Sequence, residues 1–434
     1  MAEEKSSERY ETVEPLSHVF SSEQQVRDIA ARFGTPVYVY SQQLLETQAE
    51  KALKFPNAYG LTVRYAMKAN PNANILRIFN NKGIQIDASS EHEVERAIKA
   101  GIPAKNILLT SQKTPDNLIK TLEGGVLYNA CSIHQLKNYG ECFPGTNVSI
   151  RVNPGLGSGG TNRTNTGGPA SSFGIWYEQL AEALNIAEDY NLNINRVHTH
   201  IGSGSDPEVW KKVAGMSLEI VARCLNEGNC VEVLNLGGGY KVGRMTGDSF
   251  TNLQECGDPV VEAFKSFKDR TGKKLKLEIE PGTYLVANAG AVIAEVIDGK
   301  STPGYKFIIS DSGMTEVTRP ALYGAQHPIT VIPFDTIEEA EDYIVTGKCC
   351  ESGDILTPAP GDSEGLRTRR LAKAQIDDLV VIGGSGAYCA GMSAKNYNSY
   401  PEAPEVLIDL NEQAHLIRKR QTLDQIIENE VIVV

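Results

Sequence analysis

The 434-residue sequence has few of the features that mark a metal-binding, secreted or membrane protein. Its eight cysteines include no Cys-x-x-Cys pair and its seven histidines show no zinc spacing, so we expect no metal site. Scattered thiols are typical of a reducing compartment. No run approaches the ~18 apolar residues of a membrane span, and the acidic N-terminal segment does not resemble a signal peptide. These absences predict a cytoplasmic protein without a membrane partner.

The sequence also has fewer basic than acidic residues. The chain has 42 Lys and Arg against 54 Asp and Glu, a net charge of −12, which argues against a general nucleic-acid partner. Hydrophobic residues make up 41% and charged residues 22%, as in ordinary enzymes. The length exceeds the size at which a single core stops growing, so two domains are expected.

Short β-prone runs recur along the first two thirds of the chain, and helical periodicity follows each of them. The eight runs cover residues 63–69, 84–89, 107–111, 126–130, 148–153, 197–202, 231–237 and 275–282. Strands that alternate with helices form parallel sheets. Eight such units over about 220 residues favour a (β/α)8 barrel of the TIM type, and we assign residues 37–285 to it.

The pattern changes near residue 289, where strands at 291–296, 305–309 and 379–382 are separated by turns with little helical periodicity. Residues 286–434, together with residues 1–36, are therefore predicted to form a second, mostly β domain, a barrel or sandwich. Residues 155–172 are rich in Gly, Ser, Thr and Asn, and so long a loop in a compact domain is typically functional.

Polar residues at the strand ends are the candidates for chemistry, because this barrel carries its active site at the carboxyl ends of the strands. Lys68 follows a β-prone run among small and apolar neighbours. There it is expected to be partly desolvated and nucleophilic, as a Schiff-base lysine must be. A surface lysine at a strand end is the alternative. The strand ends in order carry Lys68, Asp87, Ser111, Asn129, Arg151 with Asn153, His200 with Ser203, Gly237 to Gly239, and Glu280.

Three further strand ends give this lysine a context. Gly237, Gly238 and Gly239 allow close approach of the backbone, with free N–H groups for a phosphate, although such a run also fits an ordinary turn. His200 could stack on an aromatic ring, although a lone histidine is more often a core residue. Glu280 in a packed strand needs a cationic partner, such as a protonated pyridine nitrogen. Together they describe a site for pyridoxal phosphate.

Longer motifs extend this interpretation over nearly the whole chain. They are residues 34–40, 151–155, 164–168 and 173–176, Arg319-Pro320-Ala321-Leu322-Tyr323, Cys350-Glu351-Ser352-Gly353-Asp354, Gly386-Ala387-Tyr388, Asn396-Tyr397-Asn398 and residues 416–422. With these motifs the chain resembles the fold-type III pyridoxal-phosphate decarboxylases, and most closely their branch that acts on diaminopimelate. The resemblance implies decarboxylation of meso-2,6-diaminopimelate to L-lysine, the last step of lysine biosynthesis.

The resemblance also implies a role for each matching position. Lys68 would hold the cofactor, His200 would stack on it, and Cys350 would be the acid that returns a proton to the substrate. The cofactor-binding set is Lys68, Asp87, His200, Ser203, Gly237, Gly238, Gly239, Glu280, Gly282 and Tyr388. The substrate-binding set is Thr283, Arg319, Tyr323, Glu351 and Tyr388. Because the loop with Cys350 and Glu351 reaches the partner's barrel in this family, a homodimer with shared active sites is implied.

Two positions depart from the family, and the lesser departure is Gln326, where the family segment Tyr-Gly-x-Tyr-His has tyrosine. The motif Glu-Pro-Gly-Arg reads Glu280-Pro281-Gly282-Thr283 here, and a hydroxyl cannot replace a bidentate guanidinium. Arg151 or Arg163 could supply the missing cation. Arg319 and Tyr323 favour a substrate with a second carboxylate, whereas Thr283 leaves another basic amino acid open, namely D-lysine, ornithine or arginine. A catalytically silent regulatory relative is the remaining alternative.

Overall fold

The computed structural model describes residues 15–157, 166–200, 202, 204, 206–335 and 339–434. Two compact units share the chain. One contains the chain up to Leu45 together with Val242–Ser249 and Val286–Val434, and the other contains Glu46–Lys241 and Phe250–Leu285. The sequence prediction began the barrel domain at residue 37 and kept it continuous to residue 285. The structure instead groups residues 37–45 and 242–249 with the second unit.

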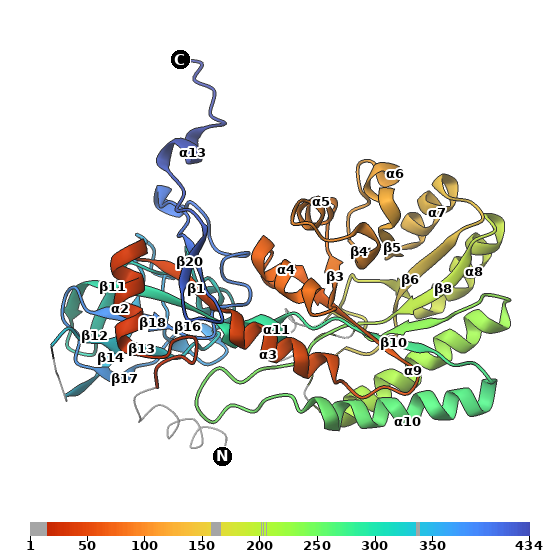
Figure 1. Ribbon diagram of the computed structural model, residues 1–434, viewed down its shortest axis with the longest axis horizontal. Helices are drawn as coiled ribbons and strands as arrows, with labels where there is room; N and C mark the ends of the chain where they lie inside the picture. The colour runs from red at the N-terminus through yellow and green to blue at the C-terminus, as the bar shows by residue number, and fades with distance from the viewer. Residues whose placement is uncertain (1–14, 158–165, 201, 203, 205, 336–338) are drawn as a thin grey trace. The chain divides into compact units, whose positions relative to one another are not determined.

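The barrel unit contains a closed ring of parallel strands, several of which are labelled in Figure 1. The ring consists of β2 (Leu61–Ala66), β3 (Gln85–Ala88), β4 (Ile107–Thr110), β5 (Leu127–Ala130), β6 (Asn147–Asn153), β8 (Asn193–His198), β9 (Val233–Asn235) and β10 (Lys276–Ile279). Each strand pairs in parallel with the next in this order, and β10 closes the ring on β2. The short strand β7 (Ile175–Trp176) extends the sheet from β6. The predicted (β/α)8 barrel is thus confirmed.

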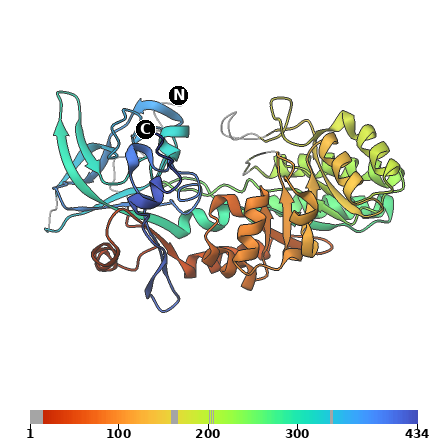
Figure 2. The ribbon, with the colours of Figure 1, turned by 90° about the horizontal axis from the view of Figure 1, so that it is seen from above.

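Helices follow these strands and surround them (Figures 1 and 2). They are α4 (Ala73–Asn81), α5 (Glu91–Lys99), α6 (Leu118–Thr121), α7 (Ile133–Cys142), α8 (Leu180–Asp189), α9 (Pro207–Asn226) and α10 (Leu253–Thr271). The Ser90 side chain accepts a hydrogen bond from the Glu93 amide and so caps α5, and Ser132 caps α7 in the same way. Of the helices in the described ranges, none is long and apolar enough to cross a membrane.

Two strands differ from the predicted ranges in a way that matters for the site. Strand β8 begins at Asn193 rather than at residue 197, and it ends at His198 rather than at residue 202. Polar residues at its start made the strand hard to predict, yet Ile194 and Arg196 are buried. Strand β9 likewise ends at Asn235, before the glycine run.

Three of the buried charged side chains of the barrel unit form one network. Glu278 on β10 pairs with Arg64 on β2 at 3.1 Å and with Arg196 on β8 at 3.1 Å, and all three are buried. Burial opposes ionisation of Glu278, but the two guanidinium groups outweigh it and lower the pKa of this carboxyl. Such a network holds only while every member is paired.

Glu278→Gln is expected to lower the free energy of unfolding by about 3–5 kcal/mol, because it leaves two buried arginines without a counter-charge. The pKa of Glu278 is lower in the folded than in the unfolded chain. Its contribution is therefore complete above the unfolded value of about 4.3 and disappears as the pH falls through the folded value. Urea unfolding at pH 7 and at acid pH measures both effects. Glu219→Gln, which removes an exposed pair with Arg270, is the control and should change little.

The second unit is mostly β, as predicted. Its main sheet runs β17-β14-β12-β11-β1-β19-β20, with β13 and β18 attached through β11. The strands are β1 (Val37–Ser41), β11 (Gly290–Ser301), β12 (Lys306–Ser310), β13 (Ile329–Ile332), β14 (Ala340–Thr346), β17 (Arg369–Ala372), β18 (Leu379–Ile382), β19 (Glu405–Ile408) and β20 (Ala414–Arg418). The second unit also contains a hairpin of β15 (Pro358–Ala359) and β16 (Asp362–Leu366). Its helix α12 (Arg319–Tyr323) carries two of the candidate substrate-binding residues.

Strand β1 explains the shifted domain boundary. It pairs antiparallel with β11 and parallel with β19, so its backbone is satisfied within the second unit. Val37 and Val39 are fully buried there, packed with Ile293 and with Val26 of α2 (Glu23–Phe33). The strand precedes the first barrel unit in sequence but belongs to the other hydrophobic core.

Candidate active site

Lys68 lies at the carboxyl end of β2, on the single 3-10 turn Met67–Ala69. The turn buries Met67 and Ala69 and leaves the lysine side chain exposed. The prediction that Lys68 is partly desolvated is therefore wrong for this structure. The turn carries its side chain past the end of the buried strand, where it is exposed. The desolvated groups of this site are carboxyls and imidazoles around the lysine.

Two of these groups are the carboxyls of Asp87 and Glu280, which are only 3% and 7% exposed. Burial raises the pKa of Asp87 well above its usual range, the charge of Glu280 raises it further, and Lys68 lowers it. Burial also raises the pKa of Glu280. Among the described residues the Asp87 Oδ1 atom has no hydrogen-bond partner. A buried pair of carboxyls with an unused acceptor suits a ligand that brings cationic or donor groups.

Glu280 lies between two side chains that the sequence did not reveal, and one of them is hydrogen-bonded to it. Asn235 Nδ2 donates to one carboxyl oxygen at 2.6 Å, and His198 Nε2 lies 3.4 Å from the other. His198 contacts Asn129 Nδ2 through Nδ1 at 2.6 Å. Burial first, and then the charge of Arg151, keep the pKa of His198 well below its usual value, which favours the neutral ring. Both residues end their strands, so correct strand bounds would have revealed them.

His200 lies beside the glycine run. Its Nδ1 accepts a hydrogen bond from the Gly238 amide at 3.2 Å, which fixes the ring. A Cβ atom at Gly237 would lie 2.4 Å from that same Nδ1, so the close approach requires glycine. Burial, then Arg151 and Lys68, hold the pKa of His200 well below its usual value. A neutral, oriented ring suits stacking on an aromatic cofactor.

The glycine run needs one correction. Free amides were expected at all three positions, but Gly237 N–H donates to Asn235 Oδ1 at 2.8 Å and Gly238 N–H donates to His200. For the Gly239 amide the described residues offer no acceptor. The run therefore shapes the site and orients its neighbours, and it offers an anion one amide rather than three.

The remaining predicted site residues of the barrel unit differ in how far they are buried. Gly282 is buried, and Thr283 is half-buried at the start of the short helix α11 (Thr283–Val286). Ser203 lies outside the described residues, as do residues 158–165 of the long loop and with them Arg163. Arg151 is buried, with its guanidinium 4.9 Å from the ring centre of Phe173.

The second unit carries the remaining candidates. Arg319 and Tyr323 are half-buried on α12, one helical turn apart. Tyr388 is half-buried with a φ of 56°, a left-handed conformation that a bulky residue adopts only when its surroundings enforce it. This strain marks the position as one that the fold maintains for a purpose.

The two adjacent cysteines differ sharply. Cys349 is buried, its amide donates to Asp354 Oδ2 at 2.9 Å, and burial and the Asp354 charge raise the pKa of its thiol to about 12. Cys350 is exposed, and its amide donates to Asn398 Oδ1 at 2.9 Å. Glu351, next to it, is exposed as well. The loop thus presents Cys350 and Glu351 and keeps Cys349 in the interior.

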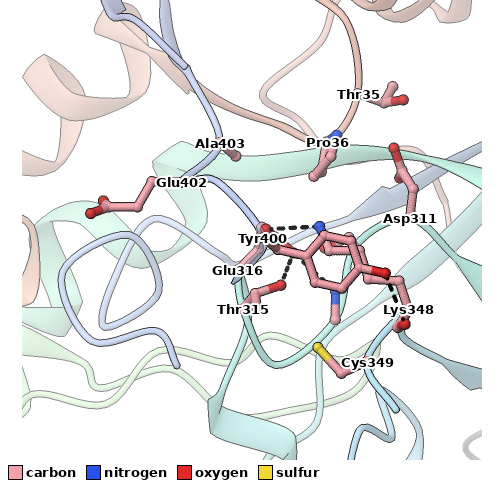
Figure 3. A network of polar contacts seen from close by, with 12 residues as sticks. Thr35, Pro36, Asp311, Thr315, Glu316, Lys348, Cys349, Tyr400, Glu402 and Ala403 are labelled. Carbon is pink, nitrogen blue, oxygen red and sulfur yellow. Dashed lines mark hydrogen bonds and ion pairs between the residues drawn. The ribbon is translucent and has the colours of Figure 1, made fainter. Parts of the chain in front are cut away.

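A buried ion pair lies next to the loop that carries Cys349, Cys350 and Glu351 (Figure 3). Lys348 Nζ lies 3.2 Å from Glu316 Oε1, and both side chains are less than one tenth exposed. The same ammonium group lies 4.7 Å from the ring centre of Tyr400. Because Lys348 directly precedes Cys349, this pair fixes the backbone that leads into the exposed residues.

The barrel unit thus brings together Lys68, buried carboxyls and an oriented imidazole at the carboxyl ends of its strands. These residues fit pyridoxal phosphate: an amine for its aldehyde, a carboxyl for its ring nitrogen and a ring to stack on it. Fold and site define a pyridoxal-phosphate enzyme of the barrel type.

Comparison with known proteins gives the same class and narrows it. Residues 43–287 match the family "Pyridoxal-dependent decarboxylase, pyridoxal binding domain". The diaminopimelate decarboxylase of Escherichia coli strain K12 is 35% identical over 420 residues, which cover 93% of this chain and 96% of that protein. A solved structure of a diaminopimelate decarboxylase has a TM-score of 0.87 at 34% identity and covers 95% of this chain and 99% of its own. The Helicobacter pylori enzyme complexed with L-lysine has a TM-score of 0.81 at 26% identity, with 93% and 98% coverage.

The chain therefore belongs to the pyridoxal-dependent decarboxylase family, and within it to the diaminopimelate decarboxylase branch. The resemblance inferred from the sequence motifs is confirmed, and pyridoxal phosphate is the cofactor.

Proposed function

We propose that this protein decarboxylates meso-2,6-diaminopimelate to L-lysine. The observation that carries the proposal is the exposed Lys68 beside the buried Asp87 and Glu280, in a chain that matches diaminopimelate decarboxylases over 93% of its length. The Helicobacter pylori relative complexed with L-lysine supports the same product.

When bound, pyridoxal phosphate accepts the electron pair that departing CO2 leaves behind. Lys68 Nζ would hold the cofactor covalently. Glu280, oriented by Asn235, would keep the ring nitrogen of the cofactor protonated. The neutral His200 ring would stack on it. The remaining members of the cofactor set would hold the ring substituents and the phosphate: Asp87, Ser203, Gly237, Gly238, Gly239 through its amide, Gly282 and Tyr388.

The second unit would serve the substrate. Arg319 and Tyr323, with Thr283 and Tyr388, would bind the carboxylate that the substrate keeps, and Glu351 would bind its distal amino group. Cys350 Sγ would donate a proton to the carbon that has lost CO2. We also propose a homodimer in which this loop completes the partner's site, and a cytoplasmic location, which the eight free thiols support.

Product analysis tests the substrate. The protein loaded with pyridoxal phosphate is incubated in parallel with meso-diaminopimelate, D-lysine, ornithine and arginine, and CO2 and amine products are quantified. Diaminopimelate is expected to give L-lysine with the highest kcat/KM. A higher value for D-lysine, ornithine or arginine would reassign the substrate. A protein that binds the cofactor but turns over none of the four would be a regulatory relative.

A further inference from the structure

Arg244 belongs neither to the cofactor-binding set nor to the substrate-binding set. It lies in the segment Val242–Ser249, which belongs to the second unit although it interrupts the barrel sequence. Its Nε donates to the Gly384 carbonyl at 3.0 Å, and a Cβ atom at Gly384 would lie 2.9 Å from the Arg244 side chain. The side chain therefore packs against the short stretch of backbone that leads to Tyr388.

A chain of polar contacts links this segment to α12. Arg369 Nη1 donates to Met245 Sδ at 3.8 Å, and Arg369 Nη2 donates to Gln326 Oε1. Gln326 Nε2 in turn donates to the carbonyl of Gly324, the residue that ends α12, at 3.0 Å. Arg244 and Arg319 thus lie on two segments that the same side chains hold together.

Within the described residues, no carboxylate forms an ion pair with Arg244 or Arg319, although Asp248 lies close enough to act on the charge of Arg244. Among those residues, Arg244 Nη2 and Arg319 Nε are buried atoms without a hydrogen-bond acceptor. The nearby carboxylate of Asp248 accepts instead from the backbone amides of Arg244 and Met245, at 3.3 and 3.0 Å. Burial, and then the charge of Arg319, lower the pKa of Arg244 to about 9.

We propose that Arg244 and Arg319 together bind the carboxylate that the substrate keeps through the reaction. Each of the two guanidinium groups has a buried nitrogen without an acceptor, which is unfavourable by itself, and a carboxylate can accept hydrogen bonds from both. The inference rests on the proposed function, whose substrate has this carboxylate. It makes Arg244 a specificity-determining residue and gives the chain a second guanidinium although position 283 is threonine.

Ligand binding to the holoenzyme tests this pair without relying on turnover. L-lysine keeps the carboxylate, whereas 1,5-diaminopentane has the same two amines and no carboxylate. Arg244→Gln is expected to weaken L-lysine binding in calorimetry by about 10- to 100-fold, as for loss of charge-assisted hydrogen bonds, and to leave diaminopentane and pyridoxal phosphate affinities unchanged. KM for diaminopimelate should rise by a similar factor, with kcat changed far less. Arg244→Lys, which keeps a charge without the fork, should fall in between.

Arg370→Gln removes an equal charge from an exposed pair with Asp342 and should behave as wild type. Unchanged L-lysine affinity in Arg244→Gln would overturn the inference. So would a loss of pyridoxal phosphate affinity with both amines weakened equally, since Arg244 would then serve the cofactor phosphate. If Arg244→Gln does not fold, the ratio of L-lysine to diaminopentane affinity in Arg244→Lys decides. Failure of the wild type to form lysine would refute the proposed function alone, because L-lysine binding still tests the pair.

Discussion

Lys68→Ala is expected to abolish decarboxylation, with a loss of at least ~10³-fold, and to abolish covalent attachment of pyridoxal phosphate. The reason is positional: Lys68 is the amine that the turn after β2 exposes beside two buried carboxyls. Borohydride reduction of the wild type followed by digestion and mass spectrometry should find a pyridoxyl group on the Lys68 peptide. The visible absorbance of the bound cofactor should be missing from the variant.

Lys99→Ala provides the matched control, because Lys99 is exposed on α5 and, among the described residues, forms an ion pair with Glu95 one helical turn earlier. It should keep full activity and cofactor content. A pyridoxyl group on any other lysine of the wild type, or substantial activity in Lys68→Ala, would show that the assignment of the cofactor to this strand end is mistaken.

Most of the fold could be read from the sequence because local patterns specify it. Alternating apolar runs and amphipathic stretches give eight strand–helix units, and parallel pairing then leads to a closed barrel. Strand ends were harder to locate. Arg196 stands within strand β8 because a buried carboxylate, Glu278, pairs with it. That pairing is a tertiary fact, and missing it displaced β8 and concealed His198.

Long-range organisation limited the site prediction in the same way. Hydrogen bonds that join distant segments decide where free donors remain, so the glycine run could not be assigned its one open amide from sequence alone. Arg244 stands in the barrel part of the sequence, yet it folds onto Gly384, 140 positions away. Only the three-dimensional contacts bring it near Arg319. The exposure of Lys68 likewise depends on a turn that the β-prone run did not predict.

Cys350→Ala is expected to lose about 10²- to 10⁴-fold in kcat, the effect of removing a positioned general acid, whereas Cys349→Ala should keep most activity. The two neighbours differ in environment: Cys350 is exposed next to Glu351, while Cys349 is buried and its pKa is raised to about 12 by burial and Asp354. Steady-state formation of L-lysine from diaminopimelate measures both variants. The opposite ranking would place the acid on Cys349 and would require the loop to rearrange when substrate binds.

Mixed subunits extend this test to the proposed dimer. If the loop with Cys350 completes the partner's site, a dimer of one Lys68→Ala and one Cys350→Ala subunit contains one site with both functional groups and one site with neither. Mixing the two inactive proteins should then restore up to about one quarter of wild-type activity, since half of the dimers are mixed and half of their sites are intact. Differently tagged subunits verify the exchange. Mixed dimers that stay inactive would mean that each site takes Lys68 and Cys350 from the same chain, because in that arrangement every site in the mixture lacks one of the two groups.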